Sequence, residues 1–301
     1  MNFDYDFLGV GGLALDLALQ VEQLPLADEK YPAQLTGKLP GGFIANATCA
    51  AARLGLRAAY VGCVGDDAEG ELLRADFVAR GVDTAGLVTV PGEPTPFTVV
   101  VTDQQGHRAI LLPSFALYRA DLTPDQLALA RRAQIVYTFP RDLAWCQQLH
   151  AATQDSGGAL ALDVETAISL PHADLLAAIR LAGIVFFTEA SFAAFDRLAP
   201  QTLIQPGQIF VITAGNRGAS AWQTGMAEPI FRPARVVEKV VDTTGAGDCF
   251  HAAFMAAHGP GADLPATLEF AHAAAALKVR HAGARGGLPT RAEVETLLNA
   301  D

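Results

Sequence analysis

Short runs rich in β-branched and aromatic residues alternate along this chain with longer segments rich in alanine and leucine. Runs of the first kind are typical of strands, and segments of the second kind are typical of helices. The pattern predicts a strand and turn at 6–11, a helix at 45–54, and further strands at 58–64, 134–138, 159–164, 183–187 and 208–213. Strands that alternate with helices form βαβ units, so we expect a mostly parallel central sheet flanked by helices.

Two stretches, 17–39 and 95–112, depart from this rhythm because they are richer in β-type alternation and in turns. In the second stretch, the alternating run 97–102 ends in the turn Asp103-Gln104-Gln105-Gly106. Two such segments inserted into a parallel-sheet domain can pair with each other. We therefore expect one α/β domain over residues 1–301, with a small β-sheet lid formed by the two insertions.

Composition narrows the classes of partner. The chain has 32 Asp and Glu residues against 21 Lys and Arg, and its net charge of -11 would repel a nucleic-acid backbone. Its four cysteines are widely spaced, which is typical of reduced core residues. No signal-peptide pattern is visible, and no apolar stretch reaches the roughly 18 residues of a membrane span. We expect a cytoplasmic protein that binds neither nucleic acid nor membrane.

The most informative segment runs from Val240 to Phe250. A β-like approach enters a Gly245-Ala246-Gly247 turn, and an apolar, helix-forming run follows. Small residues let backbone N–H groups approach an anion, and a helix start adds unpaired N–H groups and the positive end of the macrodipole. Asp248 follows directly, where a carboxylate can accept a proton from a hydroxyl that attacks a phosphate. The segment predicts a phosphoryl-transfer site.

Simpler interpretations of these residues remain open. Asp before a helix is often only a cap, and Gly-x-Gly is often only a tight turn. The residues 9–14 also fit the dinucleotide pattern G-x-G-x-x-A, although the turn-like stretch around Pro25, Asp28 and Lys30 does not suit that fold. A Walker-type phosphate loop is absent, and the seven histidines show no zinc spacing.

Longer motifs support the first interpretation. The string 242–250 resembles the C-terminal signature of the ribokinase-like (PfkB) carbohydrate kinases. The segments 39–46 and 51–55 resemble the N-terminal signature of that family, and 62–70 continues it. The pattern Thr-x-Gly-x-x-Gly at 213–218 is similar to the nucleotide side of the family. The likeness covers essentially the full chain.

The resemblance implies a ribokinase-like fold and ATP-dependent phosphorylation of a primary hydroxyl of a sugar. It implies Asp248 as the catalytic base, with Gly245, Ala246 and Gly247 holding the transferring phosphoryl group. The substrate-binding residues that it implies are Asp16, Gly42, Asn46, Arg108 and Arg141, and the nucleotide-binding residues are Thr213, Gly215, Gly218, Thr244 and Ala276. For Arg108, a solvated charge on the lid is the alternative.

The resemblance also implies metal ions. Mg²⁺ is expected with ATP because it bridges phosphate oxygens. Asp242 and Thr244 match positions that supply oxygen ligands to a monovalent cation in many relatives, so K⁺ is a candidate. One departure is that the family's Asn-x-x-Glu motif reads Thr188-Glu189-Ala190-Ser191 here. Either Glu189, although offset from the motif positions, replaces the missing motif residues, or the metal is bound mostly through water molecules.

Finer features point to a substrate subclass. The segments 108–111, 139–141 and 242–251 look most like ketohexokinase-type and sulfofructose-kinase-type members. A nucleoside or ribose-type kinase and a non-catalytic sugar or nucleotide sensor are the alternatives. A homodimer through the lid is expected because lids of this family often pair between subunits. His251 is expected on a helix surface, with a place in the lining of the active site as the alternative, and Asp163 either caps a helix or faces the phosphate.

Overall fold

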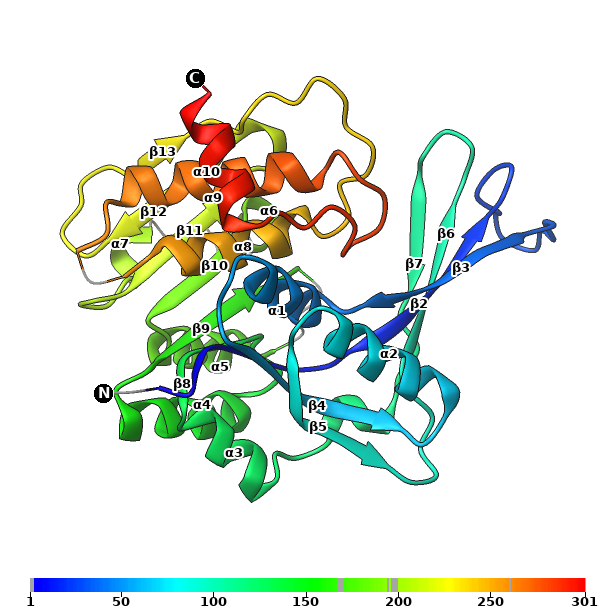
Figure 1. Cartoon of the computed structure of the whole chain (residues 1–301), viewed down its shortest axis with the longest axis horizontal. Coiled ribbons are helices and arrows are strands. Elements are labelled where there is room, and N and C mark those ends of the chain that lie inside the picture. Colours follow the sequence, from blue (N-terminus) through cyan, green and yellow to red (C-terminus); the bar gives the residue numbers. More distant parts are fainter. Residues whose placement is uncertain (1–2, 167–169, 194, 196–199, 260, 301) are drawn as a thin grey trace.

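The computed structural model of the chain describes residues 3–166, 170–193, 195, 200–259 and 261–300. Across these residues, a nine-stranded sheet forms the centre of the larger part of the molecule (Figure 1). In spatial order its strands are β13 (Ile230–Arg232), β12 (Ala219–Gln223), β11 (Ile209–Thr213), β10 (Ile184–Thr188), β9 (Ala159–Val164), β8 (Ala133–Thr138), β1 (Tyr5–Val10), β4 (Ala58–Gly65) and β5 (Asp83–Val90). All neighbours from β11 to β5 pair parallel, whereas β12 and β13 are antiparallel.

Helices cover both faces of this sheet (Figure 1). One face packs against α1 (Phe43–Arg53), α2 (Ala68–Ala79), α8 (Ala246–Ala257), α9 (Leu264–Lys278) and α10 (Arg291–Asn299). The other face packs against α3 (Pro124–Ala130), α4 (Leu143–Ser156), α5 (His172–Leu181) and α7 (Pro200–Leu203). The short helix α6 (Glu189–Ala193) follows β10, and 3₁₀ turns occur at η1 (Ala116–Arg119) and η2 (Gly215–Arg217).

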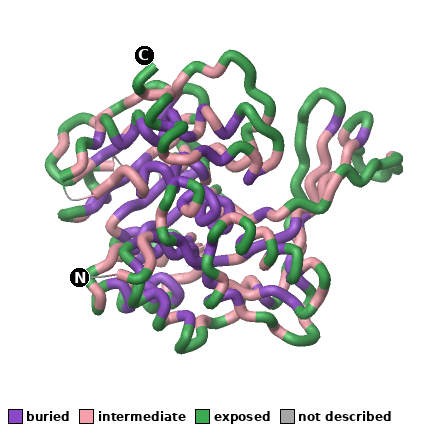
Figure 2. The backbone as a smooth tube through the Cα atoms, in the orientation of Figure 1, coloured by how far each residue is buried: buried purple, intermediate pink, exposed green. Residues whose placement is uncertain are grey.

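The strands are apolar on both faces because both faces are covered. In β1, Phe7 belongs to the core on one side of the sheet and Leu8 to the core on the other. In β10, Phe186 and Phe187 divide in the same way. Figure 2 shows that buried residues follow the sheet and the helices against it. Continuous apolar strands of this kind are what a helix-covered parallel sheet requires.

A second, smaller sheet extends from the side of the large one (Figure 1). Its order in the described structure is β3 (Gln34–Gly41), β2 (Ala14–Gln20), β6 (Phe97–Thr102) and β7 (Arg108–Leu111). The two hairpin-like pairs, β2 with β3 and β6 with β7, are antiparallel, and β2 joins β6 in parallel. The predicted α/β fold with a mostly parallel sheet and a small second sheet is therefore confirmed.

The connection that follows β1 bears on the dinucleotide-binding interpretation of residues 9–14. β1 ends at Val10, and the chain then crosses into β2 of the small sheet rather than into a helix. A helix directly after the glycines at 9–12 would be needed for a dinucleotide-binding unit, so that alternative does not hold.

No helix in the described part of the chain is long and apolar enough to cross a membrane.

Candidate active site

The predicted anion turn lies at the start of α8. Gly245 is the N-cap residue with a φ of 77°, and no side chain caps this helix start in the described structure. The Ala246 N–H donates to the Thr243 carbonyl at 3.1 Å, so it closes the turn itself. Of the three predicted amides, those of Gly245 and Gly247 are therefore the candidates for an anion. The positive end of the α8 dipole points the same way.

A loop from the C-terminal part of the chain packs against this turn. A Cβ atom on Gly245 would lie 2.4 Å from the Ala284 carbonyl oxygen, which is closer than real atoms approach. The Gly283 N–H donates to Asp242 Oδ2 at 2.9 Å. Gly245 thus serves both the left-handed backbone and the close packing of residues 282–284.

Asp248 lies in the first turn of α8 and is partly buried. Its Oδ2 accepts a hydrogen bond of 2.8 Å from the Asn46 side-chain amide in α1. Burial raises the pKa of Asp248 to about 7, although the Asn46 bond acts in the opposite direction. A carboxyl group that titrates near neutral pH is suited to accept a proton from an alcohol.

A buried polar cluster lies behind Asp248. His251 follows one turn later in α8, and its Nδ1 is 3.2 Å from Asp163 Oδ2 at the end of β9. The Tyr137 hydroxyl donates to Asp163 at 2.6 Å and lies 2.9 Å from His251 Nδ1. Burial opposes the charged imidazole, but the Asp163 carboxylate raises the pKa of His251 above its usual value.

The cluster corrects the sequence expectation for His251. His251 is only 3% exposed, so its expected place on a helix surface is wrong. The physical reason is that α8 is apolar all round and buried along Cys249–Met255, so it has no solvent face there. Asp163 is also buried, and its carboxylate binds Tyr137 and His251.

A cavity of about 1010 Å³ lies between the small sheet and the loops of the large one. Its walls include the predicted residues Asp16, Gly42, Arg108, Arg141, Asp242 and Thr244. The Asp16 carboxylate accepts a hydrogen bond from the Thr98 hydroxyl on the neighbouring strand β6. Burial raises the pKa of Asp16. A carboxylate in such a wall can bind the hydroxyl groups of a ligand.

Asn46, Asp248 and the turn at 245–247 are not in the wall of this cavity. They adjoin it through their neighbours. The Asn46 N–H donates to the Gly42 carbonyl at 2.8 Å, and Gly42 is in the wall. Residues 282–284 are also in the wall, and Ala284 packs on Gly245. The predicted acceptor side and phosphate side therefore meet at this loop.

Arg108 brings the small sheet into contact with the anion turn. Its Nη1 donates to Thr244 Oγ1 at 2.5 Å and lies 3.9 Å from Asp242 Oδ1. Its side chain stays 39% exposed, so part of the guanidinium faces the cavity and solvent. Arg108 is therefore more than a solvated charge on the lid, and contact with a substrate stays a prediction.

Arg141 is braced by its own surroundings. Its Nε donates to Asp142 at 2.9 Å, and its Nη1 donates to the Ala120 carbonyl at 2.7 Å. Its guanidinium stacks 4.0 Å above the Trp145 ring. These contacts fix Arg141 in the cavity wall, and substrate binding by Arg141 also stays a prediction.

Four predicted nucleotide residues lie away from the cavity wall. Thr213 ends β11 and donates to the Phe187 carbonyl at 3.2 Å, and Gly215 begins η2 with a φ of 60°. Gly218 has a φ of 132°, and Ala276 is buried in α9. Of the five predicted nucleotide residues, only Thr244 lines the cavity. The role of the others stays a prediction.

The oxygens expected to hold a monovalent cation are already engaged. Asp242 Oδ1 accepts from the N–H and the hydroxyl of Thr244 at 2.9 and 2.7 Å, and Oδ2 accepts from Gly283. The buried Lys278 ammonium donates to the Asp242 carbonyl at 3.2 Å. Burial opposes ionisation, but the bonds from Thr244 and Gly283 lower the pKa of Asp242. In the described structure, Asp242 Oδ2 and the Asp242 carbonyl each accept one hydrogen bond and keep a second lone pair, so K⁺ binding by Asp242 and Thr244 stays a prediction.

The binding of Mg²⁺ would depend mainly on the phosphate groups of the nucleotide. The described residues contain no group of three or more His, Cys, Asp or Glu side chains able to hold a metal by themselves. The polar groups of the altered motif at 188–191 are paired within the protein: Thr188 and Ser191 exchange hydrogen bonds, and Glu189 forms an ion pair with Arg217. Mg²⁺ often keeps several waters and binds substrate phosphates, so this arrangement fits it.

One residue of the site was not found from the sequence. Arg285, in the loop between α9 and α10, is buried and donates from Nε to Asn46 Oδ1 at 2.9 Å. Its neighbours in the chain are glycine, alanine and leucine, which indicate a loop but not a buried charge. Only the fold brings it to Asn46.

Comparison with known proteins gives one consistent result. Residues 8–291 match the family model described as pfkB family carbohydrate kinase. The chain is 32% identical to a ribokinase of Bacillus subtilis over 303 residues, covering 96% of this chain and 98% of that protein. It is 26% identical to a nucleoside kinase of Methanothermobacter thermautotrophicus, covering 97% and 95%. The structure of Arabidopsis thaliana ribokinase complexed with ribose and ATP has a TM-score of 0.84 at 27% identity and covers 99% of each chain.

The two glycines of the anion turn should respond differently to substitution. Gly245→Ala should lower the free energy of unfolding by about 1–3 kcal/mol, because alanine is strained at this φ and its Cβ meets Ala284. Gly247→Ala meets nothing within 4 Å and has no positive φ, so it should leave stability unchanged or raise it by up to about 1 kcal/mol. Chemical denaturation of both variants measures this. Equal stability of the two would contradict the packing described.

Proposed function

Because this chain belongs to the pfkB family of carbohydrate kinases, we propose that it transfers the γ-phosphoryl group of ATP to a primary hydroxyl of a sugar. The observation that carries the proposal is Asp248 itself. It follows the uncapped turn at the start of α8, is hydrogen-bonded by Asn46, and has a pKa raised to about 7. A base and an anion site thus lie side by side.

Each group of the site has its own role in phosphoryl transfer. The Asp248 carboxylate accepts the proton of the acceptor hydroxyl as its oxygen attacks the phosphorus. The N–H groups of Gly245 and Gly247 and the α8 dipole stabilise charge on the phosphoryl oxygens. Arg108 adds a positive charge from the small sheet, which closes over the cavity and excludes water. Mg²⁺ bound to the nucleotide offsets phosphate charge.

The cavity favours a polyhydroxylated acceptor. Asp16, with its carboxylate in the wall, offers acceptors for adjacent hydroxyls. We infer a ketohexose-like sugar, in keeping with the segments 108–111 and 139–141. The similarity to ribokinases and to a nucleoside kinase supports ribose-type and nucleoside acceptors as the alternative.

The small sheet also suits self-association. Its face opposite the cavity is largely apolar, with Leu17, Leu19, Val99, Val101 and Leu111 paired across the strands and Lys38 beside Leu17. Leu35 and Leu111 on this face are 56% and 58% exposed. An exposed apolar sheet face favours a partner, and we infer a second copy of this chain.

The pH dependence of the rate should follow Asp248. The carboxylate must be ionised to act as a base, so kcat/KM for the sugar should be flat above a pH of about 7. Below it, the rate should fall about tenfold per pH unit. Initial rates from pH 5.5 to 9 at saturating ATP measure this. A rate that rises towards low pH would exclude Asp248 in this role.

Removing the base should separate turnover from binding. Asp248→Asn should lower kcat by roughly 10²–10⁴-fold, because general-base catalysis contributes that much, while calorimetry still detects ATP binding. The exposed Asp155→Asn is the matched control and should keep wild-type rates. ADP release is measured over ketohexoses, aldoses, ribose and nucleosides. Near-wild-type turnover by Asp248→Asn removes it from the mechanism, and no turnover by the wild type on any acceptor favours a non-catalytic sensor.

Self-association should depend on the apolar face. Leu111→Lys places a charge on β7 opposite the cavity and should shift the protein from dimer to monomer in light scattering. Ile110→Lys changes the neighbouring residue, whose side chain is in the cavity wall, and serves as the control. A wild-type protein that is monomeric at all concentrations would overturn the inference.

A further inference from the structure

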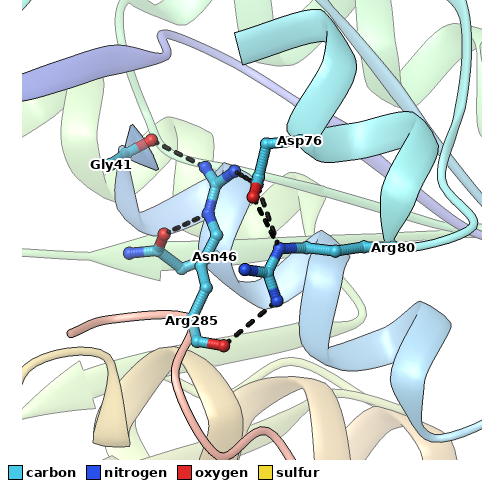
Figure 3. A network of polar contacts seen from close by, with 5 residues as sticks. All are labelled: Gly41, Asn46, Asp76, Arg80 and Arg285. Atoms are coloured by element: carbon cyan, nitrogen blue, oxygen red, sulfur yellow. Dashed lines mark hydrogen bonds and ion pairs between the residues drawn. The ribbon is translucent and has the colours of Figure 1, made fainter. Parts of the chain in front are cut away.

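Arg285 is a buried cation at the back of the candidate site (Figure 3). It is 5% exposed, and each of its three guanidinium nitrogens has an acceptor. Nε donates to Asn46 Oδ1 at 2.9 Å, Nη1 to Asp76 Oδ2 at 2.5 Å, and Nη2 to the Gly41 carbonyl at 2.9 Å. A planar guanidinium with three fixed acceptors is held in one orientation.

Helix α2 braces this guanidinium from the side away from Asn46. Asp76 also accepts from Arg80 Nε at 3.0 Å, and Arg80 Nη1 donates to the Arg285 carbonyl at 3.1 Å. Figure 3 shows Asp76 and Arg80 on one helix, facing Arg285. Arg285 does not line the cavity described above. Its contacts therefore join three parts of the chain without reaching the space for a ligand.

The bond from Arg285 decides which end of the Asn46 amide faces Asp248. A guanidinium can only donate, so the end of the amide that faces it must be the carbonyl oxygen. The NH₂ end then faces Asp248, whose Oδ2 accepts at 2.8 Å. Rotation of the amide by half a turn would set two donors against each other at Arg285 and two acceptors against each other at Asp248.

We propose that Arg285 is a positioning residue for phosphoryl transfer: it locks the Asn46 amide so that its NH₂ group stabilises the ionised Asp248 carboxylate. This inference rests on the proposed function, because it supposes that Asp248 acts as the base. Arg285 thus acts through Asn46 and touches neither the sugar nor the nucleotide. Arg285 also lowers the pKa of Asp16, against the effect of burial, so its charge reaches the acceptor side as well.

A role through Asn46 differs from a merely structural role. Hydrogen bonding to a carboxylate favours its ionised form, so an unlocked amide stabilises that form less. The acid limb of the rate profile then moves to higher pH. A residue that only holds the loop in place would change stability without moving this limb.

The pair Arg285→Lys and Arg80→Lys provides a matched test. Both changes keep a positive charge beside Asp76, but only the first removes the donor to Asn46. Thermal unfolding first confirms that each variant folds. Should Arg285→Lys fail to fold, Arg285→Gln takes its place.

A direct readout needs no substrate. The chain has four asparagines, Asn2, Asn46, Asn216 and Asn299, so selective ¹⁵N labelling gives four side-chain NH₂ signals. Asn46→Ala identifies the Asn46 signal. In the wild type this signal should shift with pH in one step, and Asp248→Asn should abolish the step. In Arg285→Lys the step should move up by about half a unit to one unit, because a carboxylate that loses a hydrogen bond ionises less readily.

Kinetics with ATP, Mg²⁺ and either ribose or fructose give the second readout. Arg285→Lys should lower kcat about tenfold and leave the KM for ATP within about twofold, since a general base is impaired and the nucleotide is not. In an Asn46→Ala background the same change should alter kcat by less than about twofold, because coupled residues are not additive. Arg80→Lys should move both readouts less than Arg285→Lys does, because it leaves the bond from Arg285 to Asn46 in place.

Two results would overturn the proposal. One is an Asn46 signal whose pH step is the same in Arg285→Lys as in Arg80→Lys, and the other is a full loss of rate from Arg285→Lys in the Asn46→Ala background. Failure of the proposed function is distinct: Asp248→Asn would then still phosphorylate the sugar. If neither sugar is a substrate, the Asn46 signal alone decides.

Discussion

A carboxylate beside a phosphate is the constraint on which this site depends. Two like charges at close range repel, and the carboxyl group must also lose part of its hydration. In this structure the uncapped start of α8 has the positive end of the helix dipole next to Asp248, and the Asn46 amide supplies a donor for Asp248. The pKa of Asp248 is raised to about 7, so both protonation states are accessible near neutral pH. Burial raises the free energy of the ionised carboxylate. It therefore also raises the pKa of Asp248 and makes the carboxylate a stronger base.

The contact between Asn46 and Asp248 depends on the whole fold. Asn46 and Asp248 are 202 positions apart, and they meet because α1 and α8 pack on the same face of the large sheet. The loop at 282–285 reaches Asn46 through Arg285, and it reaches the turn before Asp248 through Ala284, which lies against Gly245. The small sheet adds Asp16 from β2 and Arg108 from β7. Four distant parts of the chain thus meet around the candidate site.

Much of this could be predicted from the sequence where the signal is local. The apolar runs at 58–64 and 159–164 predicted strands because a sheet covered on both faces needs them, and the glycines before Asp248 predicted the turn that begins α8. β5 was not predicted because Asp83, Thr84 and Gly86 interrupt its apolar pattern. The sequence of α8 does indicate the burial of His251, because this helix has almost no polar face. What no local pattern contains is the partner of a side chain. The burial of Arg285 and the Lys278 ammonium at Asp242 arise only when distant segments pack together.

The central claim is that Asp248 faces the acceptor hydroxyl while the turn before it binds the phosphate. A crystal structure with a non-hydrolysable ATP analogue, Mg²⁺ and the sugar with the highest turnover tests this most directly. The predicted result is a γ-phosphate held by the N–H groups of Gly245 and Gly247, with a sugar hydroxyl hydrogen-bonded to Asp248. A sugar bound with no hydroxyl near Asp248, or a γ-phosphate bound away from the start of α8, would contradict it.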